Sequence, residues 1–131
     1  MTGRRLGDER GASAVEFALI VPLLVLLVLG IIEFSHAYQV QGTLSAAARE
    51  GVRVMALQDD PAAARATVRN AAGSLDPAIA DAQIAVAPAA CPVTGTSTNV
   101  RVTITYRMPY LTGLFGSGLT LSGTGVMRCN G

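Results

Sequence analysis

The dominant feature in the pattern of hydrophobic and polar positions is one long apolar run near the start of the chain. From residue 12 to residue 34 the side chains are apolar except at Ser13, Glu16 and Glu33. A helix of this length is roughly 34 Å long at 1.5 Å per residue, which is enough to cross a bilayer. Pro22 lies inside the run, either as a tolerated kink or as a point where the helix bends or melts during packing into an assembly. We therefore predict a transmembrane helix over residues 12–34.

The helical pattern continues beyond the apolar run. Small and aliphatic side chains recur at alternating steps of three and four residues, which makes a narrow apolar stripe on one helix face. The stripe consists of Ala37, Val40, Leu44, Ala47, Gly51 and Val54. We predict that the same helix extends to about Leu57 and that its small side chains let a neighbouring element come close.

A second helix is predicted after residue 58. Asp60 is suited to its N-cap and Pro61 to its first position, and the pattern of residues 62–72 ends at Gly73. Asp76-Pro77 is expected to start one further turn.

The hydrophobic period then changes to two, which is typical of strands with one buried face. A first strand contains Ile84 and Val86. In the second, apolar and polar positions alternate strictly: Val100, Val102, Ile104 and Tyr106 against Arg101, Thr103, Thr105 and Arg107. In the third, one face carries Leu119, Leu121, Gly123, Gly125 and Met127.

These segments predict an antiparallel sheet of about three strands with one face in water. The only element suited to cover the dry face is the apolar stripe of the long helix. Gly123 and Gly125 either allow that helix to approach the strand closely or simply weaken the strand. The fold class is therefore α+β.

Composition and charge narrow the class of protein. Half of the 131 residues are hydrophobic but tryptophan is absent, so the globular core must be small. Arg4, Arg5 and Arg10 precede the apolar run, which predicts an N-terminus on the cytoplasmic side. From residue 12 onward seven arginines balance seven acidic residues, and this neutrality excludes a basic surface for nucleic acid.

Cys91 and Cys129 lie far beyond the apolar run. In an exported domain such a pair usually forms a disulfide, whereas in the cytosol two isolated thiols would mean little. Cys91 follows the first strand and Cys129 ends the third, so a bridge is feasible if these strands run in the same direction.

No residue pattern indicates catalysis or a cofactor. His36 is the only histidine, and it follows Ser35, whose side chain points about 100 degrees away on a helix, with no acid placed to orient the ring. No group of Cys or His has the spacing of metal ligands. The sequence therefore predicts neither an enzyme nor a cofactor or metal site.

The motif with the most specific functional content is at the start of the apolar run. Gly11 is followed by the small Ala12, with Glu16 five positions after the glycine and Phe17 beside it. This arrangement resembles the processing site of type IV pilins and pseudopilins. The resemblance implies that a prepilin peptidase in the membrane cuts after Gly11 on the cytoplasmic side, which makes Ala12 the new N-terminus.

Cleavage would create an α-amino group with an unperturbed pKa of about 7.7–8.0, mostly charged at neutral pH. Glu16 of one subunit then either pairs with this amine on a neighbouring subunit, away from water, or only reaches back to the lipid headgroups. The first alternative makes Glu16, together with the adjacent Phe17, an assembly residue.

A longer set of motifs resembles TadE-type minor pilins of tight-adherence (Tad) pilus systems. The motifs are Gly11-Ala-Ser-Ala-Val-Glu16-Phe17-Ala-Leu, Pro22-Leu-Leu, Gly30-Ile-Ile-Glu33-Phe34 and Ala47-Ala48-Arg49-Glu50-Gly51-Val52-Arg53. The resemblance covers residues 10–57. It implies a small single-pass subunit that works with other pilin or pseudopilin subunits and with the Tad assembly machinery, in a pilus used for adhesion or envelope transport.

The expected organisation, from leader peptide to pilin-like domain, follows from this resemblance. The N-terminus lies inside, the C-terminal domain lies outside the cytoplasmic membrane, and the processed subunit then enters an extracytoplasmic filament. Arg49, Glu50 and Arg53 form either a solvated helix face or contacts between subunits. The segments are a leader over 1–11, a transmembrane helix over 12–34, its extracytoplasmic continuation over 35–57 and a small α+β domain over 58–131.

Two alternatives stay open. Ser35-His36-Ala37 has small residues where an ordinary signal peptidase would cut, which would release a secreted domain beginning at Tyr38. Against this, the run is longer than a usual signal core and contains Glu16 and Pro22. An uncleaved single-pass protein that joins no filament would instead begin at or near Met1.

Overall fold

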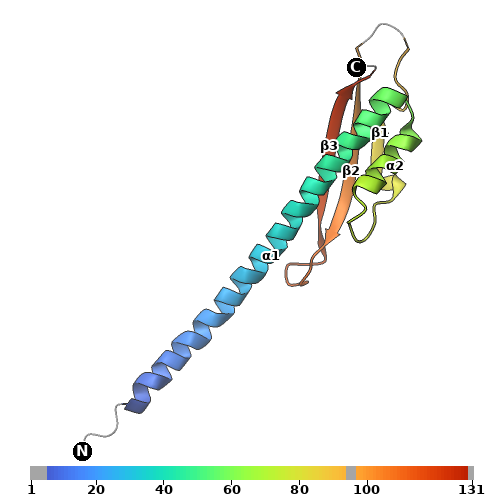
Figure 1. The fold of residues 1–131 in the computed structure, drawn as a ribbon. Coiled ribbons are helices and arrows are strands. Elements are labelled where there is room, and N and C mark those ends of the chain that lie inside the picture. Colours follow the sequence, from blue (N-terminus) through green and yellow to red (C-terminus); the bar gives the residue numbers. More distant parts are fainter. Residues whose placement is uncertain (1–5, 94–96, 130–131) are drawn as a thin grey trace, which may run out of the picture. The chain divides into compact units, whose positions relative to one another are not determined.

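The computed structural model describes residues 6–93 and 97–129, with side chains described from residue 9. It confirms the α+β class: a long apolar helix, a short second helix and an antiparallel sheet (Figure 1). The elements in these residues are α1 (Leu6–Gln58), α2 (Pro61–Ala71), the 3-10 helix η1 (Asp81–Gln83), β1 (Ile84–Ala87), β2 (Asn99–Pro109) and β3 (Gly118–Arg128). The chain divides into two compact units, Met1–Ser35 and His36–Gly131, which are described separately.

The first unit is the N-terminal part of α1. The helix begins at Leu6, earlier than the predicted start at residue 12, so Gly11 and Ala12 already lie within it. It continues through Pro22, which is the proline inside the helix. Arg4 and Arg5 lie outside the described residues.

Two consecutive aspartates end α1 and start α2. Asp59 has a φ of 51°, the left-handed conformation that ends a helix, and its N–H donates to the carbonyl of Met55 at 3.0 Å. Asp60 is the predicted N-cap, and its carboxylate accepts from the backbone N–H groups of Ala62 and Ala63 at 2.9 and 3.1 Å. The tight link leaves only two residues between the end of α1 and the start of α2.

The sheet has the order β1-β2-β3, and both pairings are antiparallel. Ile104 at the centre of β2 lies opposite Ile84 on one side and Gly123 on the other. Alternate residues of β2 are buried from Val100 to Met108, while Arg101, Thr105 and Arg107 are exposed. The predicted sheet with one wet face is confirmed.

The long helix covers the dry face of the sheet at very short range. A Cβ added to Gly123 would lie 2.6 Å from the carbonyl oxygen of Leu44, and one added to Gly125 would lie 2.6 Å from that of Ala48. These glycines therefore mark close approach of helix and strand, which decides between the two alternatives left open by the sequence. The side chain of Gln41 adds a hydrogen bond to the carbonyl of Ser122 on β3 at 2.7 Å.

The second helix packs against both α1 and the edge of the sheet. A Cβ on Gly51 would run into the side chain of Val68, so the same absence of a side chain brings α1 and α2 together. Arg65 donates to the carbonyl of Ile84 at 3.3 Å, and Arg69 forms an ion pair with Asp81. Figure 1 shows α1 and α2 on one side of the sheet, with α2 beside β1.

Three predictions about local structure need correction. The buried face of α1 is wider than the narrow stripe, since it also contains Ala48, Val52, Met55 and Ala56. On β3 only the middle of the predicted face is buried, because Leu119 and Met127 are 39% and 36% exposed. The turn expected at Asp76-Pro77 is a bend rather than a helical turn. There the carbonyl of Pro77 accepts from Tyr106 instead.

Candidate functional site in the N-terminal part of helix α1

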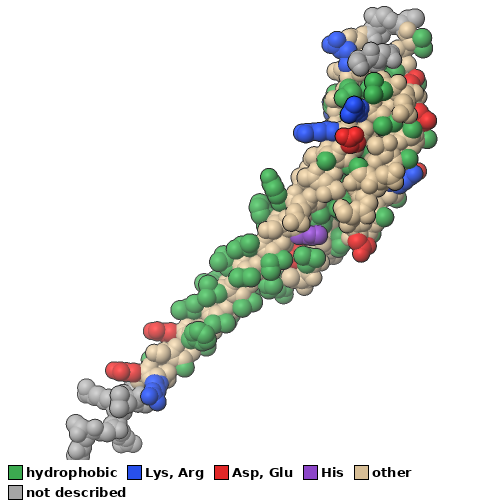
Figure 2. Space-filling view, in the orientation of Figure 1, with side chains coloured by type: hydrophobic (Ala, Val, Ile, Leu, Met, Phe, Trp, Pro, Cys, Tyr) green, Lys and Arg blue, Asp and Glu red, His purple; other side chains and the backbone are tan. Residues whose placement is uncertain are grey.

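The first unit presents an almost continuous apolar surface. Most of its large aliphatic and aromatic side chains between Val15 and Phe34 are between 45% and 73% exposed, whereas Val21 and Leu29 are half-buried. Figure 2 shows hydrophobic side chains along this part of the helix. Within the described residues, one helix is long and apolar enough to cross a membrane. A surface of this kind is stable in lipid or against partner helices and unfavourable in water.

Gly11 and Glu16 lie where another molecule can reach them. Both are exposed, and a Cβ added to Gly11 would meet no atom within 4 Å. Ala12 and Glu16 are four residues apart in a helix, so they lie on the same face, one turn apart. Phe17, next to the carboxylate, is 71% exposed. The segment therefore combines an accessible glycine and a carboxylate within an apolar helix surface.

Glu33 differs from the other residues at its end of the run. It is only 5% exposed, although it lies at the outer end of the apolar run, whereas the neighbouring Phe34 is 73% exposed. The carboxylate is therefore not a freely hydrated group.

The charged motif of the resemblance lies in the second unit. Arg49, Glu50 and Arg53 are all exposed on α1. The buried residues of the same helix segment, such as Ala48 and Val52, face the core instead. The motif therefore contains both core residues and surface charges.

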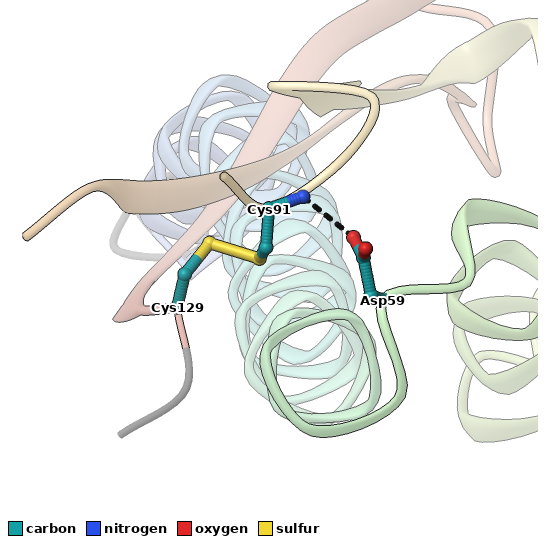
Figure 3. Close-up of a disulfide and its surroundings, with 3 residues drawn as sticks. All are labelled: Asp59, Cys91 and Cys129. Carbon is teal, nitrogen blue, oxygen red and sulfur yellow. Dashed lines mark hydrogen bonds between the residues drawn. A yellow bond between two sulfur atoms is a disulfide. The ribbon is translucent and has the colours of Figure 1, made fainter. Parts of the chain in front are cut away.

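Cys91 and Cys129, which the sequence left as a possible pair, form a disulfide, 38 residues apart in sequence (Figure 3). β1 and β3 both run antiparallel to β2, so they point the same way, and the two cysteines following them meet at one end of the sheet. The N–H of Cys91 donates to the carboxylate of Asp59 at 2.5 Å. The link between α1 and α2 is thus fastened to the disulfide, a contact that the sequence analysis missed because its partners are 32 residues apart.

The second unit also contains a hollow of about 270 Å³ that the sequence did not indicate. It lies between the first turn of α1 in this unit, the segment after α2 and the end of β2. Its lining includes His36, Asp76, Tyr106 and Tyr110. The hydroxyl of Tyr106 donates to the carbonyl of Pro77 at 2.9 Å, and burial, together with the negative charge of Asp76, raises the pKa of this phenol above 10.0.

The raised pKa of Tyr106 predicts a loss of stability at alkaline pH. The folded state favours the neutral phenol of Tyr106. The contribution of this phenol to the free energy of unfolding is therefore complete below the unfolded pKa of about 10, and it is lost as pH rises from there through the folded pKa. We expect Tyr106→Phe to lower the free energy of unfolding by about 1 kcal/mol at pH 7, because the hydrogen bond is lost. The stability of this variant should also fall less steeply at alkaline pH.

Denaturant midpoints measured between pH 7 and pH 11 test this expectation. The control is Tyr38→Phe, because Tyr38 is 75% exposed in the same unit. Equal alkaline slopes for the Tyr106 variant and the unmodified chain would contradict the assignment.

Residues 11–53 match the family model described as TadE-like protein. This segment is TadE-like. The resemblance noted in the sequence is thereby confirmed, and it supports in general terms a minor pilin role associated with a Tad pilus. Neither the comparison with curated proteins nor that with solved structures gives a match.

The TadE-like match has clear structural bounds. It begins at Gly11 and ends at Arg53, so it lies entirely within α1 and crosses from the first unit into the second. The matched segment contains both the exposed apolar surface and residues of the helix face that packs on β3. The long apolar helix and the family together indicate a membrane-anchored single-pass protein. The strands lie outside the matched residues.

Proposed function

We propose that this TadE-like chain is a non-enzymatic minor pilin, cleaved after Gly11 by a prepilin peptidase and incorporated into a Tad-type pilus. The observation that carries the proposal is the combination, within the TadE-like segment, of an open glycine, a carboxylate one turn further on, and an exposed apolar helix. In a soluble domain such an apolar surface would be exposed to water, which is unfavourable. In a helix that only anchors the protein, the charged carboxylate would add an energetic cost without a function.

The proposed topology follows from the charges around the span. The arginines before residue 12 keep the N-terminus in the cytoplasm, and the domain from His36 onward lies outside the cytoplasmic membrane. There the disulfide is chemically favoured, because extracytoplasmic compartments are oxidising. The subunit then leaves the membrane for an extracytoplasmic filament, in which its apolar helix packs against the helices of other pilins.

Cleavage after Gly11 requires local unwinding of α1. Gly11 lies inside α1, so the peptidase must unwind the helix locally to reach the peptide bond before Ala12. Glycine favours this step, because it is about 1 kcal/mol less stable than alanine in a helix interior. It also leaves the backbone uncovered, since no atom lies within 4 Å of its absent Cβ.

A processing assay tests the proposed function. The full chain is co-expressed with a prepilin peptidase of a Tad system, and the mature N-terminus is sequenced. We expect it to be Ala12, and we expect Gly11→Val to lose the cleaved product, because a branched side chain at the cut obstructs the enzyme. Gly7→Ala is the matched control within the leader. An N-terminus at Tyr38 or an uncut wild-type chain would refute the proposal.

Loss of the Glu16 charge should prevent assembly without preventing membrane insertion. Glu16→Gln keeps the shape of the side chain but cannot form an ion pair with the new amine of a neighbouring subunit. We expect at least a roughly tenfold loss of the subunit from sheared filaments. A loss of this size corresponds to about 1.4 kcal/mol of binding free energy between subunits. Glu9→Gln is the control, because Glu9 is an exposed carboxylate of the same helix that cleavage removes. Unchanged incorporation of the Glu16 variant would contradict the pairing.

A further inference from the structure

The β2–β3 loop, residues 110–117, presents an unusual apolar surface. Leu111 and Leu114 are each 59% exposed, and Phe115 is 50% exposed. No charged residue occurs between positions 108 and 127. Loops of soluble domains are normally polar, so this concentration of exposed apolar side chains indicates an interaction surface.

The loop has a defined shape. Gly113 and Gly116 have φ values of 69° and 113°, a backbone region that favours glycine. The hydroxyl of Thr112 accepts from the N–H of Leu114 at 3.4 Å, and Arg107 donates to the hydroxyl of Ser117 at 2.8 Å, at the base of the loop. The turns place Leu114 and Phe115 between the two glycines.

The position of the loop identifies what it faces. Tyr110 and Leu111 line the same hollow as His36 and Val40, so the loop lies at the end of the domain where the chain enters from residue 35. The predicted span ends at residue 34, so His36 lies within two residues of the membrane surface. Because the chain is continuous, this loop lies close to the same surface. Figure 1 shows it at the opposite end of the sheet from the link between α1 and α2.

We propose that the β2–β3 loop is a second membrane contact, which inserts Leu114 and Phe115 into the outer interface of the lipid bilayer. Apolar side chains without nearby charge enter the boundary between headgroups and acyl chains favourably, and Tyr110 has the amphipathic ring that is common at that depth. The contact holds the domain against the membrane before assembly and must break when the subunit enters a filament. It rests on anchoring by residues 12–34 and not on cleavage or pilus formation.

The absence of tryptophan allows a direct test, because one substitution creates a single fluorophore. Full-length Phe115→Trp is reconstituted in vesicles of phosphatidylcholine and phosphatidylglycerol, with or without bromine on the acyl chains. The matched control is Leu57→Trp, an exposed position, 62%, near the end of α1. Flotation of both variants with the vesicles verifies the anchor independently of the loop.

We expect Phe115→Trp to show blue-shifted emission and a loss of intensity with brominated lipids, whereas Leu57→Trp emits as in water and is not quenched. The same result in phosphatidylcholine nanodiscs holding one chain each separates lipid from a second copy of the protein. Water-like emission at both positions in chains that float would overturn the proposal. So would shielding of Phe115→Trp that appears only at high protein density and without quenching by bromine.

Discussion

Gly125→Ala is expected to destabilise the unit from His36 to Gly131 by about 3 kcal/mol, although it adds a single methyl group. The added Cβ would lie 2.6 Å from the carbonyl oxygen of Ala48, 2.8 Å from its carbonyl carbon and 3.1 Å from the backbone nitrogen of Arg49. All three atoms belong to the backbone of α1, so no side-chain rotation relieves the overlap. The helix must move away from the strand, and the contacts of the neighbouring core residues loosen with it.

Chemical denaturation followed by circular dichroism measures this loss in the full chain in detergent. Gly42→Ala is the matched control, because Gly42 is an exposed glycine of α1 whose added Cβ would meet no atom within 4 Å. That substitution should stabilise the helix by up to about 1 kcal/mol. Unfolding of both variants at the same denaturant concentration would contradict the close packing of α1 on β3.

Removing the disulfide with Cys91→Ala and Cys129→Ala together should cost about 4 kcal/mol. The bridge closes a loop with a sequence separation of 38, and the chain-entropy model assigns about this value to the restriction of an unfolded loop of that size. Its removal also frees the segment that begins at Cys91, whose N–H is bonded to Asp59. The link between α1 and α2 should then open before the rest of the domain.

The thermal unfolding midpoint is measured with and without reductant. Reductant should lower the midpoint of the unmodified chain to near that of the double variant and leave the variant unchanged. Hydrogen exchange adds a local measurement, since the N–H of Asp59 should exchange faster in the variant. A variant as stable as the oxidised protein would show that the core alone holds the sheet ends together.

Much of the fold could be predicted because its signals are local. The length of the apolar run, Asp60 followed by Pro61, and the alternation along β2 each identify an element from neighbouring residues. Contacts between distant residues could not be predicted in the same way. The pairing of Asp59 with Cys91, and the extra core residues Val52 and Met55, depend on where other elements lie.

The same division applies to the candidate site. Gly11, Ala12, Glu16 and the apolar helix lie within one short stretch of sequence, and their arrangement is helical, so the pattern alone indicated them. The sequence did not single out the β2–β3 loop, because its apolar side chains acquire meaning only from their position beside His36. That position depends on the register of the whole sheet.

By itself, therefore, the sequence determined a helix long enough to cross a membrane, its helical continuation, and a small sheet with one wet face. Only the tertiary structure decided that Gly123 and Gly125 are contact points, since their role depends on the backbone of residues 44 and 48. A glycine has the same local signal whether it weakens a strand or admits a helix. The difference is the atom that would occupy the place of its side chain, and that atom comes from a part of the chain about eighty residues away.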